Sequence, residues 1–287
     1  MRIALLVSGE PRFSYQAGSL FRNLDTKGAT IDVFIHAWDS INETLVDPDF
    51  SSWKPILHEM SNKDDIFNPI LEKVQSLGLI PRHPNLQFLN PVEKLGFQKI
   101  FGQLLSHSRV IDLFRPYSTS YDMAIRTRHD LMFDTNFMGH VNEFLQFRDH
   151  AAITFSNDRE MDIFSGGATY RNGVMLIGDC IFIATPNAFM HQTKNIEQAI
   201  LDICCALPHL FGLDESIQHR AWTLLSELNK VNLIPISAGN SWATPWPRRY
   251  SIMRPGVEKF GENLTYQQAI ECHINHHLLN GSGGLTP

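Results

Sequence analysis

The residues best suited to chemistry lie in an otherwise apolar stretch, YDMAIRTRHDLMFD, at positions 121–134. Side chains alternate between the faces of an extended strand, so Arg126, Arg128 and Asp130 are predicted to project from one face. Two cations and a carboxylate are costly to bury unless they have partners. Guanidinium forks match phosphate oxygens, and the carboxylate suits a metal ion or a sugar hydroxyl. The stretch predicts an anion site; the alternative is an edge strand whose arginines reach solvent or nearby acids.

A second candidate, SGEPR at positions 8–12, directly follows an apolar run of strand length. Gly9 permits a tight turn with close backbone approach, and Arg12 brings a cation to the strand tip. Ligands of open α/β sheets bind outside the carboxyl ends of the strands, where this segment is expected to lie. Taken alone, it is better explained as an ordinary strand-to-helix turn with a solvated arginine, since Gly and Pro are common in turns.

Acidic residues occur at two further element starts. Asp179 opens the apolar run DCIFIAT, a position that could face a pocket or simply cap a turn. Asp214 is a good helix N-cap, and Glu215 follows in the first helical turn, where the helix dipole favours a carboxylate. Helix capping and the helix dipole alone account for Asp214 and Glu215, so a chemical role for them needs further support.

The segment PWPRRYSIMRPG, positions 245–256, interleaves cations with aromatic rings. Rings stack on sugars or bases and arginines contact phosphates, so the segment predicts an acceptor platform or a loop that closes over a ligand. The alternative is an irregular segment packed against the core. The residues concerned are Trp246, Arg248, Arg249 and Arg254.

Apolar runs of strand length alternate with segments of helical periodicity, which predicts an α/β fold with a mostly parallel central sheet flanked by helices. Positions 39–84 are expected to form an irregular excursion with one or two helices. The expected strands cover residues 3–8, 32–38, 85–89, 121–126, 151–155 and 179–185, and the expected helices cover 15–23, 94–114, 186–206 and 215–228.

Composition indicates an ordinary globular protein of 287 residues, 43% hydrophobic and 19% charged. The net charge of -6 gives no general attraction to nucleic acid, although a local basic groove is compatible with it. Cys204 and Cys205 fall in an apolar helical run and are expected to be buried thiols in a reducing cytoplasm. No apolar stretch approaches the roughly 20 residues of a membrane span. We therefore expect a cytoplasmic protein.

Three of these segments, SGEPR, DVFIHAWD and YDMAIRTRHD, together resemble the SGxxR, DVFIHxWD and YDxxIRTRxD motifs of a group of phage and bacterial nucleotide-sugar glycosyltransferases of the GT-A type. The likeness covers residues 1–40 and 120–135 well and the remainder loosely. It implies one GT-A-like domain over 1–287, with a Rossmann-like, nucleotide-sugar-binding half at 1–135 and an acceptor-binding half with a closing segment at 136–287.

The resemblance also implies roles for individual residues. The donor-binding positions are Ser8, Gly9, Arg12, His36, Trp38, Arg126, Arg128 and Asp130. Asp130 takes the place of the usual DxD motif, which holds Mn²⁺ or Mg²⁺ against the diphosphate. Because this sequence has a single acid there, a second route stays open in which Arg126 and Arg128 neutralise the diphosphate. Catalytic candidates are Glu215 as base, then Asp214, and Asp179 in a GDxFxIG-like strand.

The implied activity is transfer of a hexosyl or pentosyl group from a nucleotide diphosphate donor, UDP by resemblance, to a hydroxyl acceptor. The acceptor is either a glycan or a hydroxymethylated base of phage DNA, which would place the protein in the host cytoplasm. The arginine-aromatic segment favours DNA and the acidic net charge opposes it. The alternative is a non-catalytic nucleotide- or phosphosugar-binding module with the same fold.

Overall fold

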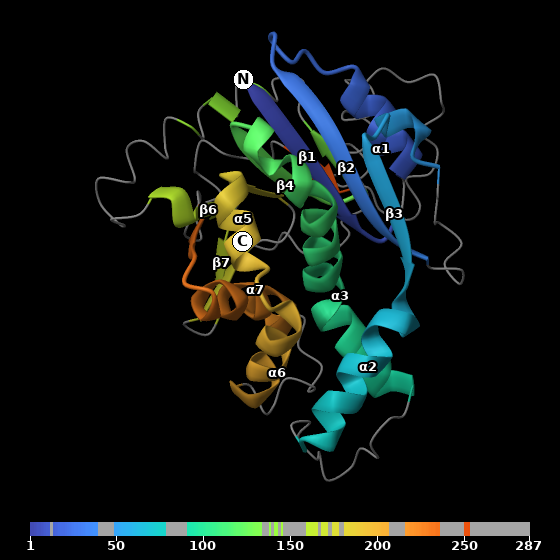
Figure 1. Ribbon diagram of the computed structural model, residues 1–287, viewed down its shortest axis with the longest axis vertical. Coiled ribbons are helices and arrows are strands. Elements are labelled where there is room, and N and C mark those ends of the chain that lie inside the picture. Colours follow the sequence, from blue (N-terminus) through green and yellow to red (C-terminus); the bar gives the residue numbers. More distant parts are fainter. Residues whose placement is uncertain are drawn as a thin grey trace.

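The computed structural model of the chain is shown in Figure 1. It describes residues 1–11, 14–39, 49–78, 91–133, 159–165, 168–171, 174–177, 181–206, 216–235 and 250–252, together with positions 138, 141, 142 and 145. No helix within these ranges is long and apolar enough to cross a bilayer.

A seven-stranded sheet forms the centre of the described structure, in the order β10-β6-β9-β4-β1-β2-β3. Within it, β9 alone runs antiparallel to its neighbours, β4 and β6, and the other pairs are parallel. The predicted α/β fold with a mostly parallel sheet is therefore confirmed. The strands are β1 (Arg2–Gly9), β2 (Thr30–Asp39), β3 (Leu57–Asn62), β4 (Met123–Thr127), β6 (Asp162–Ser165), β9 (Ile181–Ala184) and β10 (Asn232–Pro235).

Helices cover both faces of this sheet (Figure 1). One hydrophobic cluster joins the sheet to α2, α3, α5, α6 and α7, and a second joins the opposite face to α1 and to the short helix η1. The α-helices are α1 (Ser14–Arg22), α2 (Lys63–Ser76), α3 (Pro91–Phe114), α5 (Pro186–Gln192), α6 (Ile196–Ala206) and α7 (Ser216–Leu228). The short helices are η1 (Ser51–Trp53), η2 (Arg115–Ser120) and η3 (Arg159–Met161).

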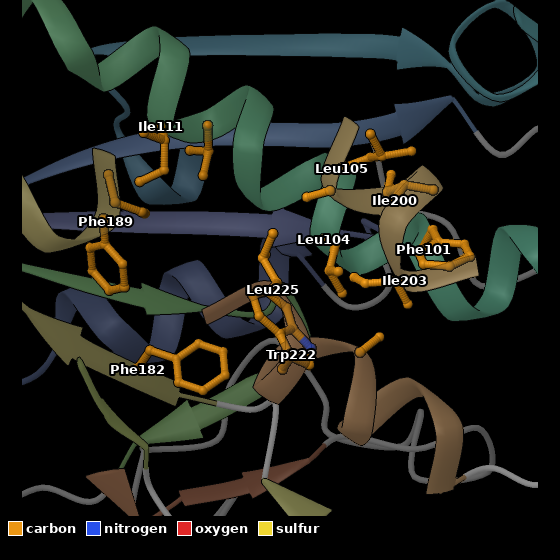
Figure 2. Packing of buried hydrophobic residues seen from close by; sticks show 14 of the residues in the cluster. Phe101, Leu104, Leu105, Ile111, Phe182, Phe189, Ile200, Ile203, Trp222 and Leu225 are labelled. Atoms are coloured by element: carbon orange, nitrogen blue, oxygen red, sulfur yellow. The ribbon is translucent and has the colours of Figure 1, made fainter. Parts of the chain in front are cut away.

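The central strands are apolar because both of their faces are covered. In β1, every residue from Ile3 to Gly9 is buried. On the α3 side, Trp222 of α7 packs on Phe182 of β9 with ring centroids 4.8 Å apart (Figure 2). These rings form the floor on which a charged side chain of the neighbouring strand β4 lies.

The stretch 121–134 does not form the single strand that its apolar character predicts. β4 ends at Thr127, residues 128–130 turn, and β5 (Leu131–Phe133) belongs to another sheet, where it pairs antiparallel with β11 (Tyr250–Ile252). A further two-stranded sheet joins β7 (Ala168–Arg171) to β8 (Val174–Ile177). Because β4 ends at Thr127, Arg128 and Asp130 lie in a turn and not on a strand face.

Two other expectations need correction. The helix expected over 186–206 is interrupted between α5 and α6, where Asn195 adopts a left-handed backbone with φ 54°. The excursion over 39–84 contains β3 besides α2; its residues alternate between half-buried and exposed, so LHEMSN lacks the apolar content of a central strand. Cys204 is buried as expected, whereas Cys205 is exposed. Strands expected at 85–89 and 151–155 lie outside the described residues.

Candidate functional site

The three motif segments meet at one edge of the sheet. Because β1, β2 and β4 are parallel, their carboxyl ends lie together: Gly9 is paired with Ala37, and Val7 with Thr127. β3 adds its own end beside β2, with Glu59 opposite His36. This is the edge at which open α/β sheets bind ligands.

Arg126 is fully buried near the carboxyl end of β4. Its Nε donates to Oγ of Ser8 at 3.1 Å, and its Nη2 donates to Oε1 of Gln103 on α3 at 3.1 Å. The guanidinium also lies over two rings, 5.6 Å from the centroid of Phe182 and 5.1 Å from that of Trp222. A buried cation is tolerated here because hydrogen-bond acceptors and ring faces replace its water.

Arg128 and Asp130 form a bidentate ion pair in the turn after β4. Nε of Arg128 donates to Oδ1 of Asp130 at 2.9 Å and Nη2 donates to Oδ2 at 2.7 Å. The Asp130 side chain is 7% exposed and that of Arg128 is 24% exposed, so the guanidinium is the more accessible partner. The three charges therefore do not share one strand face: Arg126 belongs to the strand, and the other two pair with each other in the turn.

The predicted metal site rests on Asp130. Both carboxylate oxygens of Asp130 accept from Arg128, and no cluster of three or more His, Cys, Asp or Glu with metal-binding geometry occurs in the described ranges. Carboxylate-rich oxygen shells are what Mn²⁺ and Mg²⁺ prefer. A metal at Asp130 therefore stays a prediction.

A chain of polar side chains links β1, β2 and β3 through α3. The amide of Gly9 donates to Oγ of Ser106 at 2.7 Å, and Nδ1 of His36 lies 2.7 Å from the same oxygen. On the other side of the ring, Nε2 of His36 lies 3.0 Å from Oγ of Ser61, whose hydroxyl donates to Oε1 of Glu59 at 2.9 Å. Gly9 itself has φ 121°, a left-handed conformation that favours glycine.

A second chain joins the turn after β4 to the opposite layer. Nε1 of Trp53 donates to Oγ of Ser14 at 3.0 Å, and this oxygen lies 3.0 Å from Nδ1 of His129. Nε2 of His129 lies 3.2 Å from the carbonyl oxygen of His36, within hydrogen-bond distance. The motif containing His129 is thus attached to the motif containing His36 through backbone and side chain.

Both imidazoles are neutral at physiological pH. Burial lowers the pKa of His36 to about 3, and electrostatic interactions with His129 and Arg109 act in the same direction. Burial also lowers the pKa of His129 to about 4, although its bond to the His36 carbonyl and the charge of Asp130 oppose the shift. Neutral imidazole carries one N–H and one acceptor nitrogen, which matters for the hydrogen-bond direction.

The remaining sequence candidates divide into two groups. Trp38 is buried and donates from Nε1 to the carbonyl oxygen of Gly102 at 3.2 Å, while its ring meets His36 edge to face. Ser8 is buried at the strand tip, where it accepts from Arg126. The candidates that lie outside the described residues are Arg12, Asp179, Asp214, Glu215, Trp246, Arg248, Arg249 and Arg254.

Sequence reasoning missed the residues that connect the motifs. They are Ser14, Trp53, Glu59, Ser61, Gln103 and Ser106. A signal for two of them was present, because Gln103 and Ser106 stand three residues apart in the apolar helix IFGQLLSHSRV and so share a face. The serines of other elements carry no comparable pattern.

No family model matches the chain, and no curated protein matches it. Among solved structures, it is similar to the apo form of mouse xyloside xylosyltransferase 1, with 8% identity and a TM-score of 0.36 over 82% of this chain and 84% of that one. It is also similar to a protein assigned as a nucleotide-diphospho-sugar transferase from Desulfovibrio desulfuricans G20, with 8% identity and a TM-score of 0.32 over 82% and 79%. Similarity at this level defines neither a shared fold nor a shared activity.

Proposed function

We propose that the protein is a glycosyltransferase of the GT-A type that binds a nucleoside diphosphate sugar at the carboxyl edge of β1, β2 and β4. The observation that carries the proposal is the meeting of all three motif segments at that edge in one hydrogen-bonded network. Each motif contains residues suited to binding phosphate or sugar, and together the motifs resemble those of GT-A glycosyltransferases. These segments are distant in the sequence, yet they meet at the edge where open α/β sheets bind ligands.

The two arginines would act on the departing diphosphate in different ways. Arg128 is the more exposed member of its pair, so its guanidinium can meet phosphate oxygens while Asp130 holds its orientation. Arg126 is too deeply buried for direct contact in this arrangement and would contribute positive potential from below the strand tips. Fixed cations placed where negative charge develops are effective catalysts because they need no reorganisation during reaction.

This route uses arginine in place of a metal. In it, Arg128 and Arg126 supply the positive charge that a divalent ion would otherwise provide. The Mn²⁺ or Mg²⁺ prediction at Asp130 would require Arg128 to release the carboxylate first. Turnover that survives a chelator supports the arginine route, and turnover abolished by a chelator and restored by Mn²⁺ supports the metal.

The acceptor half is proposed from the sequence resemblance. Glu215 is the first candidate for the base that deprotonates the acceptor hydroxyl, followed by Asp214, with Asp179 as a further catalytic candidate. Acceptor contacts are assigned to Trp246, Arg248, Arg249 and Arg254. A glycan and a hydroxymethylated DNA base are the two proposed acceptors, and UDP is the proposed nucleotide.

The decisive experiment incubates the protein with a panel of nucleotide sugars and two acceptors, a glycan set and hydroxymethylated DNA, followed by mass spectrometry of the products. Arg128→Ala should lower transfer about 100-fold. Arg115→Ala is the matched control, because Arg115 forms an exposed ion pair with Asp112 and precedes β4, whereas Arg128 follows it. If no donor releases its diphosphate with or without Mn²⁺, the proposal is wrong.

A non-catalytic nucleotide-binding module is the second candidate. It is favoured by the internal engagement of Asp130, whose two oxygens both accept from Arg128, since a fully engaged carboxylate has no chemistry to perform. Such a module would bind UDP or a UDP-sugar in calorimetry and lose affinity on Arg128→Ala. It would give no product with either acceptor.

A further inference from the structure

The hydrogen-bond chain through His36 can run in only one direction. At one end, the amide of Gly9 can only donate; at the other, the carboxylate of Glu59 can only accept. Ser61 has a single proton, which it gives to Glu59, so Nε2 of His36 must donate to Ser61. Nδ1 is then an acceptor, and Ser106 must give its one proton to it.

The competing arrangement fits the geometry less well. Ser106 could instead donate to the carbonyl oxygen of His36, but that contact is 3.4 Å long, against 2.7 Å to Nδ1. The carbonyl already accepts from Nε2 of His129 at 3.2 Å. The other tautomer, with the proton on Nδ1, would leave the Ser61 hydroxyl between two acceptors, Nε2 of His36 and the Glu59 carboxylate, with one proton to give.

The chain through His129 is one-way for the same reason. The indole N–H of Trp53 can only donate and a backbone carbonyl can only accept. Ser14 therefore accepts from Trp53 and donates to Nδ1 of His129, whose Nε2–H donates to the His36 carbonyl. The first hydrogen-bond chain therefore passes through the ring of His36, and the second ends at the carbonyl oxygen of the same residue.

We propose that His36 is a positioning residue for the donor site, held as the Nε2–H tautomer and tying the Gly9 tip of β1 and the turn at 128–130 to β2. Through Ser106 it fixes the amide of Gly9, and through its carbonyl it anchors His129, which lies between Arg128 and Asp130 in the chain. The Gly9 amide is already engaged, so Gly9 serves the donor through its left-handed backbone and not as a free N–H donor. The positioning role rests on the proposed function; the tautomer does not.

The tautomer is tested on the wild-type protein by long-range nitrogen NMR of the histidine rings at neutral pH. We expect the Nδ1 shift of an unprotonated nitrogen and the Nε2 shift of a protonated one for both His36 and His129. The opposite tautomer or a doubly protonated ring at His36 overturns the proposal. No variant is needed, so a folding defect cannot obscure this result.

The positioning role is tested with Ser106→Ala, which removes the bridge between Gly9 and His36. We expect the KM for the donor to rise about tenfold with kcat changed less than about threefold, because one lost buried hydrogen bond loosens a binding segment. Ser106→Thr, which keeps the hydroxyl, should recover most of the loss. Ser108→Ala, on the same helix and also buried, should leave KM unchanged. An unchanged KM in Ser106→Ala overturns the role.

Amide hydrogen exchange separates the failure of this proposal from that of the proposed function. The Gly9 amide should exchange faster in Ser106→Ala than in the wild type or in Ser108→Ala. Slow exchange retained in Ser106→Ala overturns the hydrogen-bond chain even if sugar transfer is found. A wild-type protein that transfers no sugar overturns the proposed function and the positioning role together, while the nitrogen shifts still decide the tautomer.

Discussion

Arg128 and Asp130 are joined by two parallel hydrogen bonds of 2.9 and 2.7 Å, with one residue between them in the chain. The pair is possible because β4 stops at Thr127, so the two side chains leave a turn and not alternate positions of a strand. One partner is nearly buried and the other is partly accessible. This geometry makes the carboxylate a support for the guanidinium.

A double-mutant cycle at this pair should separate its structural and chemical contributions. We expect Arg128→Ala and Asp130→Ala to show a coupling free energy of about 1–2 kcal/mol in urea unfolding, because the pair is only partly exposed. In the transfer assay, Arg128→Ala should lower kcat/KM about 100-fold, as expected for loss of a charge that stabilises the leaving group. Asp130→Asn should cost only about tenfold. A larger loss in Asp130→Asn than in Arg128→Ala would favour the metal route.

Arg126→Lys tests the buried guanidinium. A lysine ammonium cannot reproduce the planar fork that reaches Ser8 and Gln103 at once, nor its stacking on two rings. We expect a loss of about 2–4 kcal/mol in the free energy of unfolding, measured with urea. Arg109→Lys, an exposed arginine on α3, is the control and should change stability by less than about 0.5 kcal/mol. Wild-type stability in Arg126→Lys would contradict a stabilising role for the contacts of Arg126 with Ser8, Gln103 and the two rings.

Buried neutral histidines should make stability fall in mild acid. His36 and His107 have pKa values lowered to about 3 and His129 to about 4, each mainly by burial. The unfolded chain, with histidine pKa values near about 6.5, binds more protons than the folded chain as pH drops below that value, so stability present above it is lost toward pH 4.

The expected size is up to about 2 kcal/mol for each of these histidines between pH 7 and pH 5, measured by urea unfolding. His107→Phe should flatten the pH dependence, because it removes one of the three buried imidazoles. A free energy of unfolding that stays level over this range would show that the rings are not buried as neutral groups.

Gly18 should be an intolerant helix position. A Cβ at Gly18 of α1 would lie 2.8 Å from the ring of Trp53 and even closer to Oγ of Ser52. Gly18→Ala should therefore destabilise the protein by about 1–3 kcal/mol, although alanine is the better helix former. Gly102→Ala on α3 is the matched control: its nearest side-chain atoms are 3.7 and 3.8 Å away, so a gain of up to about 1 kcal/mol is expected. Thermal or urea unfolding of both variants checks the difference.

Apolar periodicity was enough to predict the sheet core and most helices, because β1, β2, α1, α3 and α7 are amphipathic or doubly covered. It failed where local geometry depends on tertiary contacts. The turn at 128–130 follows an apolar run that a continuous strand would equally explain. The strand β3 carries Glu59 and Ser61 among its half-buried positions, so its place at the sheet edge was hidden.

The candidate site was predictable in its motif residues and not in their connections. Arg126, His36 and Gly9 stand in segments that sequence alone selects. The link between Gly9 and His36 runs through Ser106, which is 97 positions from Gly9. No local sequence pattern encodes such a contact. The donor roles of these residues remain predictions until ligand binding is measured.

The reversed strand β9 also bears on the order in which the protein can assemble during synthesis. It is the sole neighbour through which β6 and β10 join β4 within the described sheet. A nascent chain that has not yet emerged to Ala184 leaves the side of β4 as an open edge, able to recruit strands from other molecules. Ribosome-tethered chains truncated before Ile181 should therefore depend on chaperones, because β9 has not yet paired with β4 and β6.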